Sequence, residues 1–192
     1  MNLQGKKYLV TGGAGFIGSE LCRQLKAAGS SVHIVDNLAN GKRENVAEVL
    51  TADCQLHVTD IRDLEQMKAL LVGCDGLFHL ACLGVRHSIH SPMENHDVNA
   101  TATLNLLRLA HEGGVPRFVY VSSSEVYGTA QSVPQPEAHP TYPMTVYGSA
   151  KLAGECYTRA FHRTYGYATV VIRPFNSYGP RSHHEGDSGE VI

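Results

Sequence analysis

Short runs of β-branched and aromatic residues alternate along the chain with longer segments whose apolar residues recur at helical spacing. The strand-like runs lie at 7–10, 31–36, 55–59, 76–81, 117–122 and 168–173, and the helical segments lie near 16–28, 63–72, 93–112 and 147–165. Buried parallel strands read as continuous apolar runs, and a helix must connect each strand to the next. The order therefore predicts a doubly wound α/β fold, with a mostly parallel sheet and helices on both faces.

Length and charge fit one ordinary globular domain. The chain has 192 residues, of which 43% are hydrophobic and 18% charged, and its formal net charge is −2. This balance gives no electrostatic attraction for nucleic acid or for an anionic membrane surface, so we expect neither as a partner. One stretch, 129–143, carries four of the eight prolines and little periodicity. We expect it to be a loop, and a loop of that length inside a compact domain is usually functional.

Cysteine and histidine usage points away from disulfides and metals. The five cysteines (Cys22, Cys54, Cys74, Cys82 and Cys156) are odd in number and lack C-x-x-C spacing. Reduced thiols in a cytoplasmic protein are the simplest interpretation. The 11 histidines show no spacing typical of a metal site, so we predict none.

A glycine-rich stretch, TGGAGFIGS (11–19), directly follows the first strand and opens the first helix. Gly12, Gly15 and Gly18 permit a tight turn and a close approach of the backbone to a pyrophosphate, which then meets the positive end of the helix. Asp36 ends the second strand, and a carboxylate there binds the adenosine ribose and repels a 2′-phosphate. The pattern predicts a Rossmann-type site for NAD in preference to NADP; the alternative is a turn that binds no ligand.

Tyr147 and Lys151, in YGSAK, lie four residues apart on a predicted helix and therefore share a face. A nearby ammonium favours the phenolate and makes tyrosine a usable base. The alternative is a solvated surface pair. Ser123 and Ser124 follow a buried strand at the sheet edge where ligands bind, and at least one serine of the group is expected to cap loop backbone instead.

Five motifs can be read together: TGGAGFIGS, DN at 36–37, SSSEVYG at 122–128, YGSAK at 147–151 and RPFNSYGP at 173–180. Their order and spacing resemble the extended short-chain dehydrogenase/reductase family, in particular its nucleotide-sugar epimerases and dehydratases. UDP-galactose 4-epimerase, dTDP-glucose 4,6-dehydratase and UDP-glucuronic acid decarboxylase are examples. The resemblance covers essentially the whole chain.

The resemblance implies further contacts. Asp60 would face the adenine amino group with Ile61 beside the ring, Ala81 would line the pyrophosphate region, and Asn99 would support the strand that carries the serines. The residues expected to bind NAD are Gly12, Gly15, Phe16, Ile17, Gly18, Asp36, Asn37, Asn40, Asp60, Ile61, Leu80, Ala81, Asn99, Ser122, Tyr147, Lys151 and Pro174.

The same resemblance assigns the chemistry and the assembly. Catalysis would use Ser123, Ser124, Glu125, Tyr147 and Lys151, and the nucleotide sugar would contact Ser124, Tyr147 and Asn176. The reaction would be a transient oxidation at sugar C4, with NAD regenerated in each cycle. A homodimer is expected.

Departures from the family pattern refine the expectation. Dehydratases carry Asp-Glu where this chain has Ser124-Glu125, which favours an epimerase or a decarboxylase over a 4,6-dehydratase. Family members also continue beyond RPFNSYGPR into a substrate-binding domain. We therefore expect residues 1–181 to form the NAD-binding domain and 182–192 to begin the connection, with the substrate domain largely absent. A UDP-sugar 4-epimerase is the leading prediction; a UDP-glucuronate decarboxylase, a dTDP-sugar 4,6-dehydratase and a non-catalytic dinucleotide-binding module are the alternatives.

Overall fold

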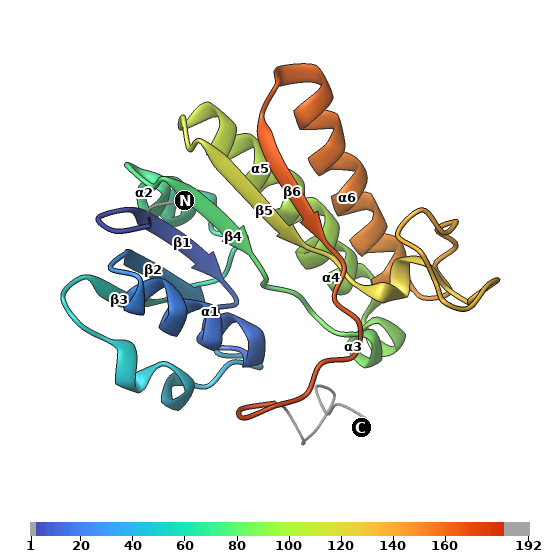
Figure 1. Ribbon diagram of the computed structural model, residues 1–192, viewed down its shortest axis with the longest axis horizontal. Helices are drawn as coiled ribbons and strands as arrows, with labels where there is room; N and C mark the ends of the chain where they lie inside the picture. The colour runs from blue at the N-terminus through green and yellow to red at the C-terminus, as the bar shows by residue number, and fades with distance from the viewer. Residues whose placement is uncertain (1–2, 183–192) are drawn as a thin grey trace.

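A six-stranded, wholly parallel sheet forms the centre of the protein, as the computed structural model shows (Figure 1). The structure describes residues 3–182. The strands lie in the order β3-β2-β1-β4-β5-β6. Their bounds are Lys7–Thr11 (β1), Ser31–Asp36 (β2), Cys54–Val58 (β3), Gly76–His79 (β4), Arg117–Val121 (β5) and Ala168–Ile172 (β6). The predicted doubly wound, Rossmann-type fold is confirmed, with each predicted strand found within two residues of its expected ends.

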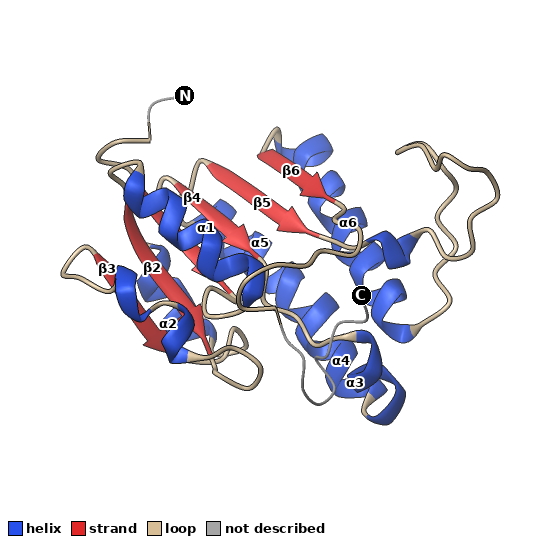
Figure 2. Ribbon diagram, turned by 60° about the horizontal axis from the view of Figure 1, so that its bottom comes forward, coloured by secondary structure: helices blue, strands red, loops and turns tan. Residues whose placement is uncertain are grey.

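Helices cover the two faces of the sheet unequally (Figure 2). One face carries α1 (Phe16–Ala27) and two 3-10 turns, η1 (Arg43–Asn45) and η2 (Ala47–Val49). The other carries α2 (Leu64–Leu71), α5 (Ala102–Glu112) and α6 (Val146–Tyr165). The outer part of the first face is left open, because Val170 and Ile172 of β6 are 54% and 47% exposed.

The alternation of side chains along the strands separates two cores. Tyr8 and Val10 of β1 pack with Cys22 and Leu25 of α1, whereas Leu9, between them, packs on the opposite side with the helices of the second face. Successive side chains of a strand point to opposite faces, so a single apolar run supplies both layers. Burial on both faces explains why the sequence shows continuous apolar runs in place of alternation.

The main differences from the predicted elements lie between β4 and β5. A short helix, α3 (Val85–His90), was not predicted. The predicted helix at 93–112 exists, but it consists of α4 (Pro92–His96), a π-helical turn η3 (Asp97–Thr101) and α5. In the π turn the side-chain amide of Asn99 donates to the Leu83 carbonyl, at 2.8 Å. Inserted turns of this kind are frequent at functional sites, and periodicity alone does not reveal them. The stretch 129–143 is a loop, as predicted.

The direction in which successive strands are added to the sheet reverses between β1 and β4. From β1 the chain builds outward to β2 and β3, and from β4 it builds in the opposite direction to β5 and β6. Because every strand is parallel, the carboxyl ends of β1 and β4 diverge at one edge of the sheet. Open α/β sheets bind their ligands at such a switch point.

Candidate functional site

The glycine turn stands at the switch point. Gly12 adopts a left-handed backbone with φ of +68°, and a Cβ built on it would lie 2.7 Å from the amide nitrogen of Ala81, at the end of β4. Only glycine suits both that backbone and that approach. The N-cap of α1 is Gly15, no side chain caps the helix, and its first turn carries no acid. The uncapped amides and the positive end of a 12-residue helix therefore face the switch point, which fits a pyrophosphate.

Asp36 ends β2 beside this turn and is 7% exposed. Its Oδ2 accepts from the amide of Ala14, at 3.0 Å, and its Oδ1 accepts from the amide of Leu38, at 2.9 Å. These bonds fix the carboxylate against the glycine turn, and a carboxylate is the kind of acceptor that a ribose hydroxyl needs. Gly41 leaves room for the Asp36 carboxylate. A Cβ at position 41 would lie 2.6 Å from Asp36 Oδ1, which is too close for a side chain to be accommodated.

The segment expected to meet the adenine is held by a fork that the sequence did not predict. Arg62 binds both carboxyl oxygens of Asp60, at 2.9 and 2.8 Å, and holds the pKa of that carboxyl below its usual value. Asn37 donates weakly to the same carboxylate, at 3.4 Å. The Ile61 side chain is 5% exposed and belongs to the core, and the place of Ile61 beside the adenine ring stays a prediction. Asn40 is exposed on the loop that follows β2.

Leu80 and Ala81 continue from β4 and are half-buried at the switch point. Their amides lie 3.2 and 3.3 Å from the Thr11 hydroxyl, which ties the ends of β1 and β4 together. Asn99 braces the next part of this loop: its side chain bonds both the amide and the carbonyl of Leu83, at 3.0 and 2.8 Å. The expectation that Asn99 supports the serine strand is corrected, because its bonds go to the loop after β4.

Tyr147 and Lys151 lie on the first two turns of α6, which begins where the Thr145 hydroxyl accepts from the amide of Gly148 at 3.0 Å. Lys151 is 2% exposed, and its ammonium donates to the Val121 carbonyl at 2.9 Å. The same nitrogen lies 5.9 Å from the centre of the half-buried Tyr147 ring. The pair is therefore no solvated surface contact: a buried cation sits between the tyrosine and the strand that leads into the serines.

The serine segment follows β5 directly and lies beside that helix. Ser123 caps the 3-10 turn η4 (Ser124–Val126), its hydroxyl accepting from the Glu125 amide at 3.2 Å. This matches the expectation that one serine satisfies loop backbone. Ser124 and Glu125 are half-buried. Ser122 is 3% exposed, and its hydroxyl has no hydrogen-bond partner among the described residues.

The RPFN segment runs next to the serines. Pro174 is half-buried and its carbonyl accepts from the Ser124 amide at 3.0 Å, whereas Asn176 is exposed. These segments therefore gather at one edge of the sheet. The glycine turn follows β1, the serine segment follows β5, the RPFN segment follows β6, and the helix of Tyr147 and Lys151 lies beside them. This one edge can hold an extended dinucleotide with a proton-transfer group at one end, and the residues present fit such a cofactor.

Comparisons with known proteins agree with this geometry. The pattern of the “NAD dependent epimerase/dehydratase family” matches residues 8–192. The chain belongs to this family. It is 36% identical over 188 residues to the UDP-glucose 4-epimerase of Mycolicibacterium smegmatis, covering 95% of this chain and 60% of that protein. It is 35% identical over 196 residues to UDP-glucuronic acid decarboxylase 2 of Arabidopsis thaliana, covering 98% of this chain and 42% of that protein.

A solved structure gives the same result. DesIV, a dTDP-glucose 4,6-dehydratase from Streptomyces venezuelae with NAD and TYD bound, is 37% identical and superposes with a TM-score of 0.89, over 94% of this chain and 59% of that one. The family inferred from the five motifs is confirmed. The chain spans 60% or less of the length of each of these three proteins.

Several supporting residues of this candidate site were missed from the sequence. His79 is 1% exposed and bridges two threonines: its Nδ1 lies 2.7 Å from the Thr11 hydroxyl and its Nε2 lies 2.9 Å from the Thr103 hydroxyl. Thr103 donates its own proton to the Asn99 carbonyl, so Nε2 must be the protonated nitrogen and Nδ1 accepts from Thr11. A histidine inside an otherwise apolar strand was the available signal. Burial lowers the pKa of His79 to about 3, with a smaller effect from the charge of Lys151.

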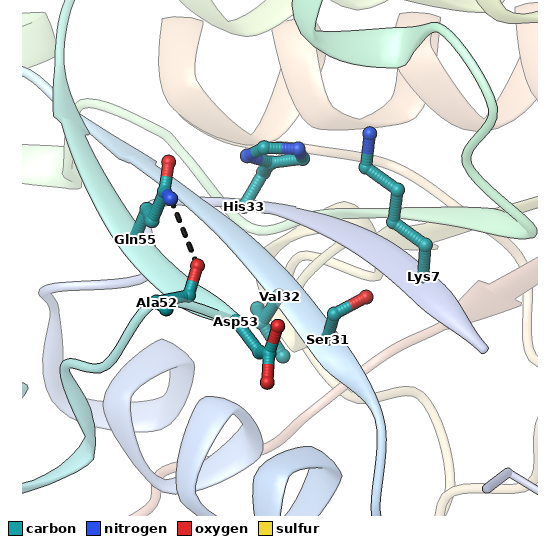
Figure 3. A pocket seen from close by; sticks show the side chains of 7 residues that line it. All are labelled: Lys7, Ser31, Val32, His33, Ala52, Asp53 and Gln55. Carbon is teal, nitrogen blue, oxygen red and sulfur yellow. Dashed lines mark hydrogen bonds between the residues drawn. The ribbon is translucent and has the colours of Figure 1, made fainter. Parts of the chain in front are cut away.

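A small pocket lies at the opposite end of the strands and is not part of this site (Figure 3). It has a volume of about 110 Å³ and is lined by Lys7, Ser31, Val32, His33, Ala52, Asp53 and Gln55. Two of its polar side chains already bond within the protein: the Lys7 amine donates to the Val72 carbonyl, and Gln55 donates to the Ala52 carbonyl. Within residues 3–182, no cluster of three or more potential ligand side chains could hold a metal ion. No helix of the described chain has the length and apolarity needed to cross a membrane.

Proposed function

We propose that this chain forms the NAD-binding part of a nucleotide-sugar 4-epimerase that acts on a UDP-sugar. The observation that carries the proposal is the position of Lys151, whose buried ammonium bonds the residue before the serines and faces the Tyr147 ring. A fixed positive charge there favours the tyrosine phenolate, which is the form that can take a proton. The family and its NAD dependence support the same conclusion.

The residues have distinct proposed roles. The uncapped start of α1 and Asp36 would hold the pyrophosphate and the adenosine ribose of the cofactor. When bound, NAD supplies an acceptor for the hydride of sugar C4. Tyr147 takes the proton of the C4 hydroxyl, Lys151 stabilises the resulting phenolate, and Ser123 or Ser124 orients the hydroxyl. The 4-keto sugar can then rotate within the site. Return of the hydride to its other face completes an epimerisation.

One second candidate has support of its own. Glu125 is half-buried next to Ser124, and the decarboxylase of Arabidopsis thaliana is as similar to this chain as the epimerase is. A UDP-glucuronate decarboxylase would use the same oxidation at C4 and then release CO₂ from the keto intermediate. The dehydratase alternative is weaker, because Ser124 stands where an acid is expected.

The decisive experiment compares the parent with Tyr147→Phe in the full-length protein. Reduction of NAD is followed by NADH absorbance in a single turnover with UDP-glucose, and product analysis with UDP-glucose and UDP-glucuronate separates epimerase from decarboxylase. Because a general base contributes roughly 100- to 10,000-fold, Tyr147→Phe is expected to slow NAD reduction by at least about 100-fold and to leave NAD binding nearly intact, since the ring still packs. A variant that keeps more than about a tenth of the parent rate contradicts the proposal. A parent that binds NAD without sugar turnover is a non-catalytic dinucleotide-binding module.

We also propose a cytoplasmic homodimer that binds neither nucleic acid nor membrane. The near-neutral charge and the scattered cysteines of the sequence support the partner and compartment proposals. The family resemblance supports the dimer and the division at residue 181. Sedimentation equilibrium of the full-length protein measures the oligomeric state, and a monomer at micromolar concentration would overturn that part.

A further inference from the structure

A buried ion pair connects α6, which carries Tyr147 and Lys151, to the segment that follows β6. Glu155 lies on α6, one turn after Lys151, and is 0% exposed. Arg173 directly follows β6. Its Nε and Nη2 donate to the two carboxyl oxygens of Glu155, each at 2.7 Å. Two parallel bonds of this kind fix direction as well as distance, so the pair orients the segment after β6 relative to the helix of Tyr147.

The neighbours of Arg173 hold the serine segment. The Ile172 carbonyl accepts from the Ser122 amide at 2.7 Å, and the Pro174 carbonyl accepts from the Ser124 amide at 3.0 Å. Arg173 is the residue between these two acceptors. The serine segment is hydrogen-bonded to the backbone of Ile172 and Pro174. The Arg173 side chain therefore connects that backbone to α6.

The same guanidinium has a third anchor. Its Nη1 donates to the Glu137 carbonyl at 3.2 Å, and its centre lies 4.6 Å from the centre of the Tyr127 ring. Tyr127 ends the 3-10 turn that follows the serines, and Glu137 belongs to the proline-rich loop. The Arg173 side chain thus contacts three segments outside its own: α6, the proline-rich loop and the end of the serine turn. The hydrogen bonds of Glu155 also raise the pKa of Arg173, so its charge is permanent.

A buried ion pair of this kind is not expected to add much to the free energy of unfolding, so stability alone does not explain why it is present. Removing two charges from water offsets most of their attraction, and apolar replacements are often as stable, whereas a buried pair can specify one arrangement of its segments. We infer that Arg173 is a positioning residue: through Glu155 it holds the serine segment in register with Tyr147 and Lys151. The catalytic consequence rests on the proposed function; the structural one does not.

Amide hydrogen exchange of this chain tests the structural part directly. The variant is Arg173→Gln, with Arg173→Lys as a conservative partner that keeps the charge and loses the fork. The matched control is Arg159→Gln, because Arg159 bonds the same Glu155 carboxylate, at 2.6 Å, from within α6 itself. We expect exchange at the Ser122 and Ser124 amides to accelerate about tenfold or more in Arg173→Gln, less in Arg173→Lys, and hardly in Arg159→Gln, because only the first two release the segment after β6.

The Leu9 and Val10 amides of the central strand report global stability in the same experiment. Parent-like exchange at Ser122 and Ser124 in Arg173→Gln overturns the inference. So does an acceleration that is equal at all four amides, or equal in Arg159→Gln, because either result reduces the pair to general stability. If Arg173→Gln does not fold, Arg173→Lys decides by the same criteria.

Kinetics of the full-length protein test the catalytic part. In Arg173→Gln we expect the single-turnover rate of NAD reduction to fall about 10- to 100-fold, because small displacements of reacting groups have effects of this size. NAD affinity should stay at the parent value, and Arg159→Gln should keep the parent rate. A parent-like rate in Arg173→Gln overturns the catalytic part. If the parent itself shows no sugar-dependent NAD reduction, the proposed function fails, and hydrogen exchange still decides whether Arg173 positions the serine segment.

Discussion

Gly148 of α6 lies against the backbone of Glu125, so that a Cβ at position 148 would come within 2.8 Å of the Glu125 carbonyl oxygen. This contact sets how closely the helix approaches the serine segment. Tyr147 is the adjacent residue of the same helix, so this contact also limits how closely its backbone can approach the serine segment. A backbone oxygen cannot move aside as a flexible side chain can, and any larger residue must displace the helix.

Gly148→Ala is therefore expected to impair chemistry more than cofactor binding. A displacement of about 1 Å in reacting groups can cost on the order of 100-fold in rate, so we expect a loss of about 10- to 100-fold in single-turnover NAD reduction by the full-length protein. NAD affinity, measured by calorimetry, should change little. Ser149→Ala, at the exposed neighbouring position, is the control. An unchanged rate of NAD reduction in Gly148→Ala would show that the close approach of α6 to the serine segment is not needed for the chemistry.

Ser122→Ala tests the buried hydroxyl that has no partner within residues 3–182. A buried polar group without a partner is costly, so its removal should leave the unfolding midpoint of the unliganded chain equal or higher. If NAD supplies the partner, the variant should bind NAD up to about tenfold more weakly, which is the size of one ordinary hydrogen bond. Isothermal calorimetry measures the affinity and thermal denaturation the stability. An unchanged affinity for NAD would remove Ser122 from the cofactor site.

Asp36→Asn tests the choice of cofactor. Asparagine keeps the shape of the side chain and one acceptor for the Ala14 amide, but it loses the charge that repels a 2′-phosphate. The parent should prefer NAD over NADP, and the ratio of the two dissociation constants should fall by about tenfold or more in the variant. Titration of both cofactors by calorimetry gives the ratio. A parent that binds them equally would contradict the role of Asp36.

His79 makes folding sensitive to acid. Its pKa is about 3 in the folded protein against an ordinary 6.5, because burial disfavours the charged form. Between these values the unfolded chain binds the proton and the folded chain does not. The free energy of unfolding therefore falls as pH decreases from about 6.5 toward 3, with a slope approaching 1.4 kcal/mol per pH unit for one such group.

The test is urea denaturation at pH 7 and at pH 5. His79→Gln should be less stable than the parent at pH 7, because it loses the bridge between Thr11 and Thr103, yet it should lose less stability on acidification. His33, whose pKa burial lowers to about 4, acts in the same direction, so His33→Gln in the partly exposed pocket is the comparison. An equal loss of stability in the parent and in His79→Gln would mean that His79 does not titrate as described.

Part of the site could be predicted from local patterns because its chemistry is local. The glycines of the first turn are required by backbone conformation and by the start of a helix, and both are properties of adjacent residues. Tyr147 and Lys151 share a helix face because of their spacing. The role of Asn99 was predicted less well, because the direction of its side-chain amide depends on packing, as does the burial of Ile61.

The sequence by itself determined the parallel sheet, its main connecting helices and the family. Continuous apolar runs, helical spacing and five ordered motifs are all patterns along the chain and need no tertiary contact to be recognised. Only the tertiary structure decided which distant groups meet. The Arg173–Glu155 pair and the Thr11–His79–Thr103 bridge each join residues at least 18 positions apart, and Gly148 finds Glu125 only after α6 has docked on the sheet. Such contacts arise when α6 docks on the sheet and when parallel strands bring their carboxyl ends to one edge, which no local pattern encodes.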